Sequence, residues 1–139
     1  MHWPGGQRGA YRTPVPVTPG LSATVEHVVV DDDTALAMRS GAVPVLATPR
    51  VIALCEEASF SAVEGELGPG ETTVGTKVQI DHLAPVATGH TVRAEASVEK
   101  VNGRRITFTV SVTDERGLVA VGRVTRVVVE TERFLDKTR

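Results

Sequence analysis

The sequence lacks the features that mark disulfide-stapled, membrane-spanning or nucleic-acid-binding proteins. Its 139 residues include one cysteine, Cys55, so no disulfide can form within a chain, and we expect a core residue there rather than a nucleophile. No apolar run approaches the length of a transmembrane helix, and the N-terminus lacks the apolar core of a signal peptide. The 15 basic and 17 acidic residues leave no basic excess for phosphate binding. We therefore expect a cytoplasmic protein whose partners are neither membrane nor nucleic acid.

The N-terminal segment has too little apolar periodicity to form an element of the fold. Residues 1–20, MHWPGGQRGAYRTPVPVTPG, combine repeated prolines and glycines with few aliphatic residues. This composition predicts a disordered tail over residues 1–18, although Trp3 and Tyr11 are able to dock it on the rest of the chain. Residues 19–139 have the length of one domain with a single core.

The only long helical pattern lies in VLATPRVIALCEEASFSAVEG. Thr48 is predicted as its N-cap, Pro49 as its first residue and Gly65 as its left-handed stop. At about 100° per residue, its apolar stripe contains Val51, Ile52, Cys55, Ser59, Ala62 and Val63. Glu56 borders this stripe, whereas Glu57 points away. A carboxylate beside a buried stripe needs a partner, so Glu56 is a functional candidate; the alternative is a rim residue whose charged end reaches water.

After this helix the apolar period changes from 3.6 to 2, which predicts strands. They are expected at residues 72–82, 91–101, 106–112 and 118–131, with another at 21–30 before the helix. In the first of the four, one face carries Val74, Thr76, Val78, Ile80 and His82, so His82 ends a core-facing row. The dipeptide Asn102-Gly103 predicts a hairpin turn with two positive-φ residues.

A strand, a long helix and four consecutive antiparallel strands predict an α+β architecture in which the sheet wraps around the helix. This topology matches the hot-dog fold. One helix cannot cover both faces of such a sheet, so we expect a homodimer formed through a strand edge or a sheet face.

Three polar residues emerge from these patterns, namely Thr48, Glu56 and His82. Each by itself has an ordinary structural interpretation: a helix cap, a rim carboxylate and a histidine at a strand end. No periodicity argument brings the three side chains together.

The runs ATPRVIALCEE and GTKVQIDH resemble the fluoroacetyl-CoA thioesterase family of hot-dog proteins. That family carries a threonine, a glutamate eight positions later and a histidine twenty-six positions after that, and residues 48, 56 and 82 match both intervals without a gap. The family's Gly-Thr pair recurs as Gly75-Thr76, its Gly-x-x-x-Arg as Gly122 and Arg126, and its short basic hairpin as NGRR. The resemblance covers about residues 19–134.

The resemblance implies a homodimeric acyl-CoA thioesterase for a short or modest acyl chain, with no cofactor and no metal. It makes Thr48 the nucleophile or the group that orients it, and His82 the general base. Glu56 then fixes the imidazole or activates water. Gly75 lets the thioester approach the backbone, and Arg126 either binds substrate or pairs with Glu56. Thioester hydrolysis needs these groups because it requires a polarised carbonyl and an activated oxygen nucleophile.

Two alternatives stay open at this point. A hot-dog hydratase or dehydratase also uses a histidine and a carboxylate, and a non-catalytic acyl-CoA-binding protein can share the fold. The threonine favours hydrolysis over hydration. Fluoroacetyl selectivity is not implied, because the phenylalanines that form a lid in the family's namesake are absent from the corresponding stretch, LAMRSGAVPVL.

Overall fold

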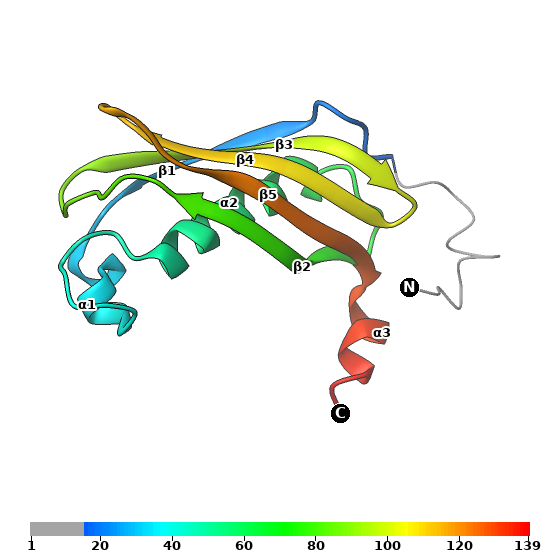
Figure 1. Cartoon of the computed structure of the whole chain (residues 1–139). Coiled ribbons are helices and arrows are strands. Elements are labelled where there is room, and N and C mark those ends of the chain that lie inside the picture. The colour runs from blue at the N-terminus through cyan, green and yellow to red at the C-terminus, as the bar shows by residue number, and fades with distance from the viewer. Residues whose placement is uncertain (1–15) are drawn as a thin grey trace.

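The computed structural model describes residues 16–139. Its elements are β1 (Ser22–Val28), the short 3₁₀ helix η2 (Asp31–Asp33), α1 (Ala35–Met38), α2 (Thr48–Glu64), β2 (Glu71–His82), β3 (Thr91–Asn102), β4 (Arg105–Asp114), β5 (Gly117–Glu130) and α3 (Thr131–Asp136). The five strands form one antiparallel sheet in the order β1-β3-β4-β5-β2. In Figure 1 the sheet curves over α2, which confirms the predicted α+β architecture. Within residues 16–139, no helix has the length and apolar character needed to cross a membrane.

The ends of α2 differ from those predicted. Its N-cap is Ala47, with φ of -74° and ψ of 143°, and Thr48 is the first helical residue. The predicted Thr48 cap is therefore wrong, because no side-chain bond caps this end. Gly65 has a φ of -70° and does not form the predicted left-handed stop. Instead the chain leaves α2 through a right-handed turn in which the N–H of Glu66 donates to the carbonyl of Val63.

The buried face of α2 is rotated slightly from the predicted stripe. It adds Leu54 and Ala58, while Ile52 is only half-buried. The cause is the position of the helix, which packs chiefly against β1 and β3. Its buried residues are Val51, Leu54, Cys55, Ala58, Ser59, Ala62 and Val63. Glu56 borders this face and Glu57 is exposed, as predicted.

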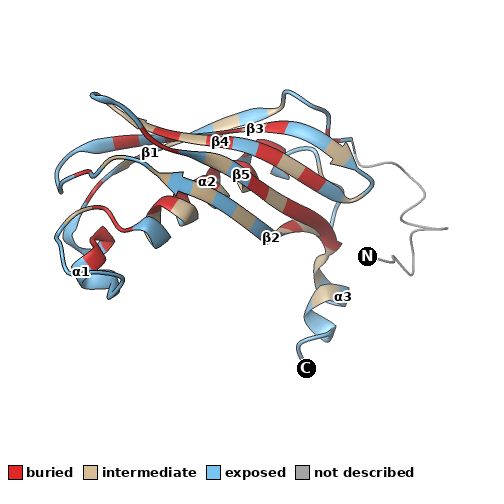
Figure 2. Ribbon diagram, viewed as in Figure 1, coloured by how far each residue is buried: buried red, intermediate tan, exposed pale blue. Residues whose placement is uncertain are grey.

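The two central rows of the sheet confirm the period-2 prediction. Figure 2 shows buried and exposed residues alternating along these strands. The core-facing rows are Val92, Ala94, Ala96 and Val98 on β3, and Ile106, Phe108, Val110 and Val112 on β4, each at most 3% exposed. Phe108 is the largest fully buried side chain, so the core is mainly valine and alanine around one aromatic ring.

A β-bulge at Thr76 changes which residues of β2 face α2. The register against β5 shifts between Gly75 and Lys77. Because one extra residue reverses the alternation of side chains, the predicted row is wrong before the bulge and right after it. The buried Thr73 and the position of Gly75 face α2, as does His82 at the end of the strand.

The structure also differs from the predictions at the turn between β3 and β4 and at the N-terminal segment. Asn102 pairs with Arg105, so the turn is formed by Gly103 and Arg104; only Gly103 has a positive φ, and the predicted pair of positive-φ residues at 102 and 103 is wrong. At the N-terminus, residues 1–15, including Trp3 and Tyr11, lie outside the described residues. Val17 is 4% exposed and belongs to the core, so at least this part of the predicted tail packs on the domain.

Candidate active site

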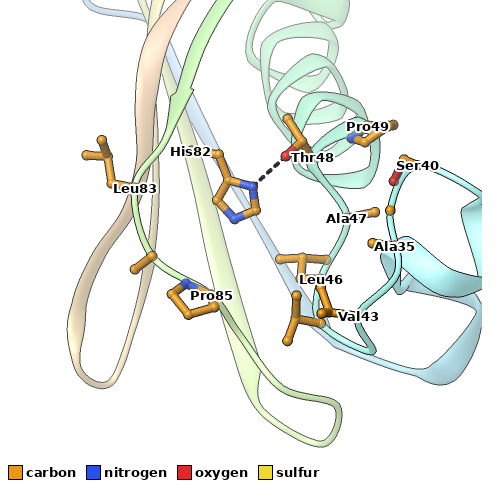
Figure 3. Close-up of a pocket in the computed structure, with 13 residues that line it drawn as sticks. Ala35, Ser40, Val43, Leu46, Ala47, Thr48, Pro49, His82, Leu83 and Pro85 are labelled. Atoms are coloured by element: carbon orange, nitrogen blue, oxygen red, sulfur yellow. Dashed lines mark hydrogen bonds between the residues drawn. The ribbon is translucent and has the colours of Figure 1, made fainter.

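Thr48 and His82 meet where the start of α2 lies beside the end of β2. Thr48 Oγ1 is 2.8 Å from His82 Nδ1, and Figure 3 shows the two side chains pointing toward one another. When the imidazole proton is on Nε2, the hydroxyl donates to Nδ1, which is the arrangement that activates a hydroxyl for nucleophilic attack. This bond also explains why Thr48 does not cap its helix.

The second nitrogen of the ring is the site's unpaired polar atom. His82 Nε2 is buried and has no hydrogen-bond partner within residues 16–139. A buried polar atom without a partner costs free energy, and native proteins keep few of them. The described residues therefore leave this nitrogen without a partner of its own.

Glu56 is held by Arg126 rather than by His82. Arg126 Nη1 donates to Glu56 Oε2 at 3.2 Å, while Nε and Nη2 donate to the hydroxyl and carbonyl of Thr73 at 2.8 and 2.9 Å. The guanidinium lies 5.9 Å from the ring centroid of Phe60 and is buried. Burial lowers the pKa of Arg126, and the charge of Glu56 opposes that shift. Arg126 therefore faces protein groups on each of its nitrogens, which suits a positioning role better than substrate binding.

Gly75 allows the Glu56 carboxylate to approach the backbone of β2. A Cβ at this position would collide with Glu56 Oε2 and lie 3.4 Å from Arg126 Nη1. Only glycine leaves room for the carboxylate and its partner together. Gly75, Glu56 and Arg126 form a second cluster, which we call the carboxylate cluster.

The carboxylate cluster is separate from the Thr48–His82 pair within one chain. Eight residues along a helix correspond to about 12 Å, and Glu56 is not among the residues that line the pocket of Thr48 and His82. The structure thus joins two of the three predicted catalytic residues and places the third with Gly75 and Arg126.

A pocket of about 400 Å³ opens beside Thr48 and His82. Figure 3 shows Leu46 and Val43 on one side of it and Leu83 and Pro85 on the strand side. The full lining is Ala35, Ser40, Gly41, Val43, Val45, Leu46, Ala47, Thr48, Pro49, His82, Leu83, Ala84 and Pro85. We call it the Thr48 pocket below.

A buried aspartate supports one wall of this pocket, and sequence reasoning missed it. Asp33 accepts hydrogen bonds from Val30 N–H at 2.8 Å and Arg50 Nε at 2.9 Å, and its Oδ2 is 2.7 Å from His27 Nε2. Its carbonyl accepts from Ala47 N–H, the residue before Thr48. Burial by itself raises the pKa of Asp33, but these bonds outweigh it and the pKa is lowered from 3.8. The acidic run DDD carries no signal that distinguishes Asp33 from its neighbours.

Cys55 is not a nucleophile in this arrangement. Its side chain is buried in the core, and burial, together with the charge of Glu56, raises the pKa of its thiol to about 11. The part of the chain that the structure describes also has no cluster of three or more His, Cys, Asp or Glu side chains that could hold a metal. Among the described residues that line the pocket, Thr48 and His82 are the two whose side chains share a hydrogen bond.

Comparison with known proteins gives consistent matches. The family described as "Fluoroacetyl-CoA-specific thioesterase" matches residues 29–132. A curated fluoroacetyl-CoA thioesterase from Streptantibioticus cattleyicolor is 35% identical over 95 residues, 68% of each chain. Among solved structures, the fluoroacetyl-CoA thioesterase FlK has a TM-score of 0.84 at 29% identity, covering 88% of this chain and 96% of that one. A thioesterase superfamily member from Thermus thermophilus has a TM-score of 0.83 at 32% identity, covering 89% and 92%. These likenesses confirm the predicted hot-dog fold.

Proposed function

Because the chain belongs to the family of fluoroacetyl-CoA-specific thioesterases, we propose that it hydrolyses an acyl-CoA thioester with Thr48 and His82 as its reacting groups. The family match supports the class of reaction. The observation that supports the site is the hydrogen bond of 2.8 Å between a hydroxyl and an imidazole that both line a mainly apolar pocket.

In the proposed reaction, Thr48 Oγ1 attacks the thioester carbonyl carbon while His82 Nδ1 takes the hydroxyl proton. The C–S bond breaks and CoA leaves as a thiolate, which needs little acid assistance because thiols ionise far more readily than alcohols. The CoA thiolate or bulk water then takes the proton from the His82 imidazolium, so the neutral ring can act as a base again. Water attacks the acyl-threonine ester while His82 takes its proton. The ester C–O bond breaks, and His82 returns the proton to Thr48 Oγ1 as the carboxylic acid is released. If His82 instead activates water directly, no acyl-enzyme forms, so trapping that ester by mass spectrometry separates the two routes.

Self-association offers a role for the separate carboxylate cluster. The strand β2 is 12 residues long and forms one edge of the sheet, with its outer backbone groups unpaired by any other strand of the described chain. Such an edge favours pairing with a second copy about a two-fold axis. An antiparallel pairing centred at about residues 78 and 79 sets His82 opposite Gly75 of the partner subunit. Glu56 of the partner subunit then lies beside His82, so we propose a homodimer whose sites combine residues of both chains.

The test of the activity is release of free thiol from a panel of acyl-CoA thioesters, followed with a thiol reagent. We expect turnover by the wild type and loss of turnover in His82→Ala. Binding of acyl-CoA with no turnover of any member would instead support a non-catalytic binding protein. Loss of the enoyl absorbance of a 2-enoyl-CoA, without thiol release, would support the hydratase. The cytoplasmic location expected from the sequence stays a prediction.

A further inference from the structure

We propose that the Thr48 pocket accepts the acyl group and selects an uncharged aliphatic group that is larger than acetyl. This inference rests on the proposed thioesterase function, because Thr48 and His82, which both line the pocket, fix where the thioester carbonyl lies. It names the class of acyl group that the rest of the pocket accepts.

The chemistry of the lining excludes a charged acyl group. Among the described residues that line the pocket, the polar side chains are Ser40, Thr48 and His82, and there is no lysine, arginine, aspartate or glutamate. A second carboxylate, as in a dicarboxylic acyl group, would meet no cation on these walls, and the carboxylate of Glu56 of the partner subunit, proposed above to lie beside His82, would repel it. Burying an unpaired charge is far more costly than burying a methylene chain. The pocket therefore favours hydrocarbon.

The size of the pocket exceeds what a two-carbon acyl group fills. Its volume is about 400 Å³, whereas one water occupies about 30 Å³ of liquid, and an acetyl group displaces only a few such volumes. Small residues such as Ala35, Gly41 and Ala84 line the walls, and the His82 imidazole is the only aromatic ring among the described residues of the lining. A longer chain displaces water from these apolar walls, and each added methylene that is buried strengthens binding.

The same lining is chemically suited to the acyl group and not to the CoA arm. The pantetheine arm carries two amides that need hydrogen-bond partners, and it ends in phosphates that need cations. Within residues 16–139, the lining offers one hydroxyl beyond the Thr48–His82 pair, that of Ser40, and no basic side chain. An aliphatic chain needs neither kind of partner. The CoA arm is therefore expected to leave the site on the side of His82 away from the pocket.

The experiment measures kcat/KM for acetyl-, butyryl-, hexanoyl- and succinyl-CoA. Since one methylene in an apolar pocket changes kcat/KM by about 10-fold or more, we expect hexanoyl-CoA to exceed acetyl-CoA by at least about a hundredfold. We expect succinyl-CoA to fall at least about a hundredfold below butyryl-CoA, because its carboxylate finds no partner. Equal rates for acetyl- and hexanoyl-CoA, or a preference for succinyl-CoA, would overturn the proposal.

A variant pair locates the effect in the pocket. Val43→Phe narrows the pocket, so it should lower kcat/KM for hexanoyl-CoA at least about tenfold while acetyl-CoA changes by less than about threefold. Val28→Phe is the matched control, because Val28 is 52% exposed, close to the 53% of Val43, but does not line the pocket. An unchanged chain-length profile in Val43→Phe, or the same change in Val28→Phe, would contradict the assignment.

A binding measurement separates this inference from the proposed function. S-hexyl-CoA and S-ethyl-CoA are thioethers that cannot be hydrolysed, and calorimetry reports their affinity directly. If no thioester is turned over, the proposed function fails, yet tighter binding of S-hexyl-CoA by the wild type, weakened in Val43→Phe, would still support the pocket. Equal affinities would overturn the pocket even in an active enzyme.

Discussion

The hydroxyl of Thr48 bonds to His82 and does not cap the first turn of α2. The effect of Thr48 on activity can therefore be separated from its effect on stability. A threonine N-cap contributes about 1 kcal/mol to stability, but here the capping residue is Ala47. Thr48→Ala should therefore leave the free energy of unfolding within about 0.5 kcal/mol of wild type. It should lower kcat at least about a hundredfold.

The pairing of Thr48 with His82 also predicts non-additive kinetics. The double variant Thr48→Ala/His82→Ala should be hardly slower than His82→Ala, because two groups that act as a unit cannot each be lost twice. Thr48→Ser retains the hydroxyl and serves as the control. Independent, multiplying losses would show that the 2.8 Å hydrogen bond does not serve the reaction.

The ion pair of Glu56 with Arg126 leads to a further prediction about kcat. Glu56→Gln removes the charge that Arg126 holds and should lower kcat at least about a hundredfold, whereas the exposed Glu57→Gln should change little. Gly75→Ala should reproduce part of this loss by displacing the Glu56 carboxylate, with a small cost in stability because the end of that side chain can move. Full activity in Gly75→Ala would mean that the position of Glu56 is unimportant.

At the scale of elements, Asp33 fixes β1 and η2 to the first turn of α2 through His27 and Arg50. The pKa of Asp33 is lower in the folded protein than its ordinary value. Its stabilising contribution is therefore complete above the unfolded pKa of about 3.9 and is lost as the pH falls through the lower folded value.

The free energy of unfolding tests this cluster. Asp33→Asn should cost about 2 kcal/mol at pH 7, the scale of hydrogen bonds to a charged group. The difference between wild type and Asp33→Asn should shrink as the pH falls below about 4. Asp32→Asn is the control, since Asp32 is exposed. A difference that grows as the pH falls below about 4 would have the wrong sign for a carboxylate with a lowered pKa.

Deletion of residues 1–15 and substitution of Val17 separately test how the two parts of the N-terminal segment contribute to stability. Residues 1–15 have a composition that should contribute little to stability, so removing them should leave the melting temperature nearly unchanged. Val17 is buried in the core, and Val17→Ala should cost about 1.5 kcal/mol for two buried methyl groups. If removing residues 1–15 destabilises the protein strongly, Trp3 or Tyr11 packs on the domain.

At the scale of the whole molecule, the two separated clusters make the dimer testable by complementation. Light scattering should give about twice the chain mass of 14.7 kDa. Mixing His82→Ala chains with Glu56→Gln chains, each nearly inactive, should restore activity, because a mixed dimer then has one site with both native residues. With random exchange this amounts to about a quarter of the wild-type sites. No restoration in mixed dimers would show that each site draws both residues from one chain.

The sequence by itself determined the long helix and the five strands, because local patterns of residue types encode them. The alternation in β3 and β4 identified their buried rows, and the spacing of Thr48, Glu56 and His82 identified the family before any contact was known. Such signals are local, or repeat at fixed intervals, and so can be read without coordinates.

Only the tertiary structure decided how these elements use their polar groups. The bulge at Thr76 reverses the side-chain alternation in β2. The glycine at position 75 is a residue type that often marks a bulge, but only the pairing of β2 with β5 fixes where the register shifts. The hydroxyl of Thr48 could bond to its own helix or to His82, and the carboxylate of Glu56 to His82 or to Arg126; in both cases a residue distant in sequence provides the partner. The burial of Asp33 between His27 of β1 and Arg50 of α2 likewise depends on how these two elements pack together. Periodicity fixes which side of an element a residue lies on, but the packing of one element on another fixes which atom it meets.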